Sequence, residues 1–136
     1  MPAYGASFIT RGYIYPAGTL NESNGVNPDG SPEFPEKVLG EWICRGWMVG
    51  EGMRTTTGVM VITTQLFSFG DEQGSAMLVT DGHELADVGV EITRAVTGGT
   101  GSFAGAGGEA RQSLLGVNVT EGVNLQFELE LDDSGF

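Results

Sequence analysis

The chain has 136 residues, with 6 Lys+Arg against 18 Asp+Glu and a formal net charge of −12. This length predicts a single domain over residues 1–136. Such an acidic chain is a poor match for nucleic acid or an anionic membrane surface, because both reward clustered Lys and Arg. The 23 glycines indicate many tight turns and argue against long helices.

The predicted elements are strands, because apolar and polar residues alternate with a period close to two. We predict strands at Ser7–Tyr15, Val38–Val49, Thr55–Phe69, Ser75–Glu84, Val88–Thr97, Glu109–Val117 and Val123–Leu131. The alternation is clearest in Val123–Leu131, which has one apolar and one polar face. Thr55–Phe69 exceeds the usual strand length of about 5–6 residues and could bend into two strands.

One connection, residues 16–36, is long and rich in proline, with Asn-Gly and Asp-Gly pairs. It cannot form a regular element, and loops of this length serve as lids, as binding loops or as flexible connectors. Its apolar Phe34 could cover a cavity, so a lid is one of these alternatives. The tail, residues 132–136, is expected to fray.

The start of the chain lacks a basic segment followed by an apolar one, so we expect a cytoplasmic protein. A mature domain cut from a secreted precursor remains an alternative. Seven or eight strands with short connections and no helical periodicity predict an all-β antiparallel barrel or sandwich.

The segment from Val90 to Glu109 carries a glycine-rich motif after an apolar strand. It reads Gly98-Gly-Thr-Gly-Ser-Phe-Ala-Gly-Ala106, followed by Gly108-Glu109. It resembles the strand–turn–strand of the allene oxide cyclase and dirigent-like barrels, a superfamily that includes bacterial cyclases resembling Diels–Alderases. The resemblance implies a single closed antiparallel barrel of about eight strands, a homodimer or homotrimer, and a cyclase or isomerase activity.

In such a barrel we expect Phe103 to plug one end and leave the opposite mouth open to a ligand. The glycines favour a structural role for the motif, because they allow positive φ angles and close backbone approach. Nucleotide binding is not supported: the spacing is GxGxxxG, no helix start follows it, and no lysine follows the glycines.

Few residues suit standard catalytic chemistry. His83 is the single histidine and Cys44 the single cysteine, which excludes a disulfide and a two-histidine metal site within this chain. Asp81 and His83 share a strand face. They could form a weak metal site, but an exposed polar strand end is the simpler interpretation of this pair. We therefore expect neither a metal nor a cofactor.

The predicted strand Val38–Val49 is apolar on both faces. Trp42, Cys44 and Met48 share one face, and Ile43, Arg45, Trp47 and Val49 share the other. One face should line the lumen, and the other should meet either a second subunit or covering loops.

Arg94 is the charged residue most out of place, because it falls on the apolar face of Val88–Thr97. A charge inside a lumen is costly unless it is paired or used. It could stabilise an enolate or bind a carboxylate, or it could form a structural ion pair with Glu91 or Glu41. The candidate catalytic residues are Arg94 and Tyr13, and the candidate substrate-binding residues are Trp42, Cys44, Met48, Gln65 and Phe67.

These residues lead to three hypotheses. The first is a cofactor-free cyclase or isomerase that holds an apolar, unsaturated small molecule in one folded conformation. That the chemistry is a cyclisation follows from the resemblance alone. The second is a carrier that binds such a molecule without chemistry, and the third is a structural subunit with a filled lumen. A cavity of about 300 Å³ or more would favour the first two.

Overall fold

The computed structural model describes residues 4–21, 23–50, 60–72 and 74–132. These residues form a single seven-stranded antiparallel sheet in chain order, and a short 3₁₀ helix, η1 (Pro35–Lys37), is the one helical element they contain. The strands are β1 (Ser7–Ile14), β2 (Gly40–Gly50), β3 (Met60–Ser68), β4 (Ala76–Leu85), β5 (Glu91–Gly101), β6 (Gly108–Val117) and β7 (Val123–Leu131). The all-β prediction is therefore confirmed.

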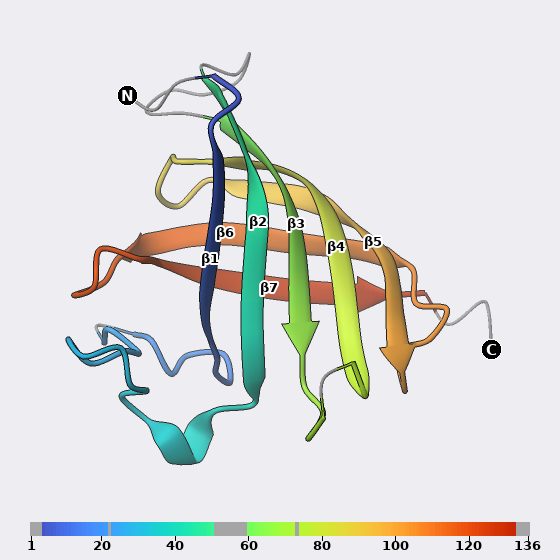
Figure 1. The fold of residues 1–136 in the computed structure, drawn as a ribbon, viewed down its shortest axis with the longest axis horizontal. Coiled ribbons are helices and arrows are strands. Elements are labelled where there is room, and N and C mark those ends of the chain that lie inside the picture. The colour runs from blue at the N-terminus through green and yellow to red at the C-terminus, as the bar shows by residue number, and fades with distance from the viewer. Residues whose placement is uncertain (1–3, 22, 51–59, 73, 133–136) are drawn as a thin grey trace.

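The sheet curls into a half-barrel. Strands β1 to β4 run side by side, and β6 and β7 cross behind them in a different direction (Figure 1). The curl follows from the divergence of β4 and β5. Their pairing ends at Asp81 and Ala95, whereas β4 stays paired with β3 as far as Leu85.

The prediction that the barrel is closed is wrong for the described residues, which contribute seven strands. Within them, β1 pairs with β2 alone and β7 pairs with β6 alone, so an open seam separates β1 from β7. Closure requires these two edges to lie side by side in register. Here the loop after β1 bonds both to the turn before β7 and to β7 itself, and the two edge strands are not paired with each other.

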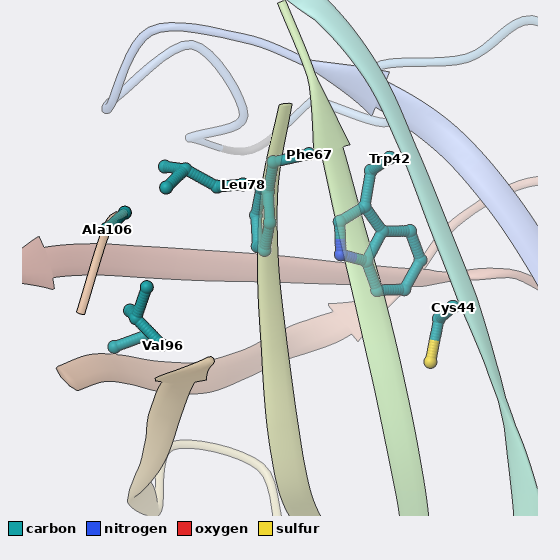
Figure 2. Close-up of a cluster of buried hydrophobic side chains, with 7 residues drawn as sticks. Trp42, Cys44, Phe67, Leu78, Val96 and Ala106 are labelled. Carbon is teal, nitrogen blue, oxygen red and sulfur yellow. The ribbon is translucent and has the colours of Figure 1, made fainter. Parts of the chain in front are cut away.

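The core lies between the two crossing layers, on the concave face. Its cluster of buried residues consists of Trp42, Cys44, Phe67, Leu78, Val96, Ala106 and Ala110. Figure 2 shows how close Trp42, Phe67 and Leu78 lie to one another. The period-two pattern explains this cluster, because alternate residues of each strand point to the same face.

Most strand limits agree with those predicted from the sequence to within a few residues. The predicted segment 55–59 lies outside the described residues, as does most of the predicted frayed tail. The largest difference is in β5, which continues through Gly98 and Gly99 to Gly101 where a turn was predicted. A Cβ at Gly99 would lie 2.4 Å from the Phe103 oxygen and 2.8 Å from the Met77 oxygen, so this strand end requires glycine.

Candidate functional site

A cavity of about 660 Å³ opens at the seam between β1 and β7. Its walls come from β1, the loop after β1, the start of β2, the end of β3, the β6–β7 turn and β7. Ligand pockets typically measure about 300–1,000 Å³. The cavity is therefore large enough for a small organic molecule, and it lies at the seam instead of in a closed lumen.

Aromatic rings form the inner wall of this cavity. The Phe67 and Phe127 rings meet edge to face with their centroids 4.9 Å apart, and the Trp42 ring lies 6.3 Å from that of Phe127. β2 and β3 bring Trp42 and Phe67 together because these two residues are paired across the strands. Phe127 comes from the predicted apolar face of β7, where nothing in the alternation distinguishes it from its apolar neighbours.

The Trp42 indole is embedded in this wall, and its ring nitrogen has no partner in the part of the chain that the structure describes. Among the described residues, its Nε1 is the buried side-chain nitrogen or oxygen without a hydrogen bond. In Figure 2 this nitrogen lies on the side of the ring that faces Phe67. A buried donor without an acceptor costs free energy, about 1–3 kcal/mol.

The long loop covers one side of the cavity. Tyr13 on β1 and Tyr15 just after β1 hold the loop, because their hydroxyls donate to the backbone oxygens of Gly30 and Gly25. The loop is fixed to the β6–β7 turn by Asn24, whose side chain accepts from the Val119 N–H at 2.9 Å. The side chain of Asn124 on β7 donates to the Asn24 carbonyl at 3.1 Å. These bonds hold the loop across the seam.

A second interior feature is a buried polar network outside the cavity lining. Glu84 accepts hydrogen bonds from Thr63 Oγ1 and Gln112 Nε2, both at 2.6 Å, and from Cys44 Sγ at 3.3 Å. Gln65 Nε2 donates to Gln112 Oε1 at 3.0 Å.

The network continues from Gln65 to Arg94. Thr80 Oγ1 donates to Gln65 Oε1 at 3.2 Å, and Arg94 Nε donates to Thr80 Oγ1 at 3.4 Å. The network therefore spans five strands, β2 to β6, as one connected chain of hydrogen bonds.

Arg94 is 2% exposed, and its guanidinium is held by backbone. It donates to the carbonyl oxygens of Thr63 at 3.1 Å, Thr80 at 3.3 Å and His83 at 3.3 Å. His83 lies beyond the last β4–β5 pair, so Arg94 fills the space where these strands separate. Burial lowers the pKa of Arg94, and the charge of Glu84 partly offsets that effect.

The sequence-based candidates therefore separate into two groups. Tyr13, Trp42 and Phe67 line the cavity, whereas Cys44, Gln65 and Arg94 belong to the buried network. Met48 is half-buried near the far end of β2 and is not among the lining residues. Glu91, considered as an ionic partner of Arg94, is exposed on the opposite face of β5.

Phe103 is half-buried and packs against the core, with its ring 5.8 Å from that of Phe69. Phe69 also lines the cavity. The turn that carries Phe103 follows β5, and the long loop follows β1. Both strands end on the same side of the half-barrel (Figure 1). Phe103 thus lies at the end of the half-barrel that holds the cavity, whereas the opposite mouth was expected to receive the ligand.

Other ionisable groups show no grouping typical of a metal site. Within residues 4–21, 23–50, 60–72 and 74–132, no three His, Cys, Asp or Glu side chains are grouped to hold a metal ion. Asp81 accepts hydrogen bonds from Thr64 and Thr97, and these bonds lower its pKa.

The described residues also contain no helix that is apolar and long enough to span a bilayer.

Cys44 is expected to resist modification by thiol reagents in the folded protein. Burial, together with the nearby charge of Glu84, raises the pKa of its thiol from 9.0 to about 12. The nucleophilic thiolate is therefore scarce at every pH below about 12, and the thiol is also sterically shielded. Labelling with 5,5′-dithiobis(2-nitrobenzoate) should stay slow from pH 7 to pH 9 and become fast in denaturant.

A matched control for that labelling is the double variant Cys44→Ala with Thr93→Cys, which moves the thiol to an exposed position on the outer face of β5. This variant should react rapidly without denaturant, and faster as the pH rises. Rapid reaction of Cys44 in the folded wild type would contradict the expected burial.

Comparisons with known proteins give no identification: no family model, no curated protein and no solved structure matches this chain.

Proposed function

We propose that this protein binds an apolar, unsaturated small molecule in the cavity at the seam between β1 and β7. The observation that carries the proposal is a cavity of about 660 Å³ with Trp42, Phe67 and Phe127 in its wall. Apolar pockets with a few convergent polar groups are the usual form of a small-molecule site. The long loop would retain the ligand by closing one side of this cavity.

A second candidate function is catalysis by confinement: cyclisation or isomerisation without a cofactor. The aromatic wall favours it, because ring faces stabilise positive charge that develops in an unsaturated substrate. Holding one folded conformer would lower the entropic part of the barrier. The resemblance of Gly98–Glu109 to the allene oxide cyclase and dirigent-like barrels supports the same activity.

The binding test uses Trp42 as its reporter. Trp47 lies on the outer face, so Trp47→Phe leaves Trp42 as the single tryptophan. The probe is retinol, a neutral conjugated polyene that absorbs where tryptophan emits. We expect saturable quenching of Trp42 emission at one probe per chain.

Gly12 offers a way to fill the cavity without removing core contacts. It lines the cavity, and a Cβ built there would meet only Trp42, at 3.8 Å. Gly12→Leu should therefore weaken retinol binding at least tenfold and leave the fold intact. The matched control is Gly98→Leu, at a strand position where a Cβ meets nothing within 4 Å. Quenching that does not saturate, or unchanged binding by Gly12→Leu, would overturn the proposal.

Catalysis is tested separately, by incubating the protein with linear polyenes and searching by chromatography for products of unchanged mass. An isomerase gives such products, and Trp42→Phe should slow their formation more than it weakens binding. Saturable binding without any product would leave the carrier function as the conclusion.

A further inference from the structure

The outer face of β1 to β4 carries exposed apolar side chains that the cavity does not use. The strand register places Trp47 beside Ile62 and Ile62 beside His83. Further along the same strands, Ile9 of β1 pairs with Arg45 of β2, and Ile43 of β2 pairs with Leu66 of β3. We call this surface the outer apolar face; it consists of Ile9, Ile43, Trp47, Ile62, Leu66 and Val79.

The exposure of this face is large for aliphatic and aromatic side chains. Ile9 is 72% exposed, Trp47 is 49% exposed and Ile62 is 47% exposed. All three come from adjacent strands: Trp47 is paired with Ile62, and Ile9 lies diagonally across from Trp47. The row Arg45–Thr64–Asp81 separates them from the second apolar row, Ile43–Leu66–Val79. Contiguous exposed apolar patches mark interaction sites.

This face differs in net charge from the rest of the molecule. It carries Arg11 and Arg45 together with Glu41 and Asp81, so its charges cancel although the chain has a net charge of −12. Neither arginine forms an ion pair with another described residue. The outer face of β5 to β7 is acidic by contrast, with Arg111 against Glu91, Glu109, Glu128 and Glu130.

We propose that the outer apolar face of β1 to β4 binds the same face of a second copy of this chain, which makes the protein a two-fold symmetric dimer. Two chains this acidic repel each other, and the repulsion is weakest where each presents a neutral surface. The neutral face is also the apolar one. In a two-fold interface the contacts are reciprocal, so a face that bears both signs of charge is complementary to itself.

This arrangement explains why β2 is apolar on both sides. Trp42 and Cys44 point into the core, and Ile43 and Trp47 point to the partner. Two sheets that pack face to face bury such side chains in a layer about 10 Å thick. Arg11 and Arg45 would then lie near the carboxylates Glu41 and Asp81 of the second copy.

The test is sedimentation velocity of the full chain over a wide range of protein concentration. The wild type should sediment as a dimer, with twice the chain mass of 14.3 kDa. Ile62→Glu and Ile62→Lys should both give monomers, because each places a charge in the apolar contact. Using both signs removes net charge as an explanation, since only one of them makes the chain more acidic.

The controls are Thr93→Glu and Thr93→Lys, at an exposed position on the outer face of β5. Both should remain dimeric, and circular dichroism should show all four variants folded. A wild type that stays monomeric at the highest concentration overturns the proposal. So does a dimer that Ile62→Glu and Ile62→Lys leave unchanged.

Discussion

Replacing Arg94 with methionine is expected to lower the free energy of unfolding by about 3 kcal/mol or more. The substitution keeps most of the side-chain volume but removes the donors to the Thr63, Thr80 and His83 carbonyls. Each buried acceptor left without a donor costs about 1–3 kcal/mol. Urea unfolding at fixed protein concentration measures the change.

A buried charge can often be replaced by an apolar side chain with little loss, provided its partners are replaced as well. Here the partners are backbone carbonyls and cannot be replaced, so we expect the loss to dominate over relief of desolvation. Arg94→Lys keeps the charge but supplies donors from one nitrogen, so its loss should be intermediate.

The control for Arg94 is Arg111→Met. Arg111 forms ion pairs with Glu128 and Glu130 at the surface, at 2.8 Å and 2.6 Å. Exposed ion pairs contribute about 0–1 kcal/mol, so this variant should change stability little. An Arg94→Met protein as stable as the wild type would show that the guanidinium does not hold β4 and β5 at their divergence.

Phe67→Ala is expected to lower the free energy of unfolding by about 3–5 kcal/mol. Phe67 is 2% exposed and packs edge to face on Phe127, which belongs to the layer behind it. Truncation removes that contact and joins new empty volume to the existing cavity. Retinol binding should weaken as well, because the probe loses an aromatic surface. Thermal unfolding and the Trp42 quenching assay measure the two effects.

Phe67→Leu, which keeps most of the apolar volume, should lose less stability than Phe67→Ala. The surface control is Leu131→Ala at the exposed end of β7, where the loss should be below about 1 kcal/mol. If Phe67→Ala cost no more than Leu131→Ala, the contact between the two layers would not be a main source of stability.

The sequence predicted strands accurately wherever alternation was regular. For Val123–Leu131 the predicted and observed limits coincide, and Arg94, which the alternation places on the apolar face of its strand, is 2% exposed. The limits of β5 were less predictable. Glycine permits both a turn and an extended strand, so the sequence alone does not distinguish them. In the structure Gly99 is part of the strand, where the Phe103 and Met77 backbone oxygens approach it closely.

The amino-acid sequence by itself determined that this chain forms an antiparallel sheet with one buried face, because a period of two leaves no other way to bury its apolar residues. It also determined that β2 would be apolar on both sides. Only the tertiary structure decided that β1 and β7 stay apart, that the cavity opens at their seam, and which polar groups meet Arg94. These features depend on contacts between strands that are distant in the sequence. They also depend on backbone carbonyls, and because every residue has one, the sequence does not show which of them become partners.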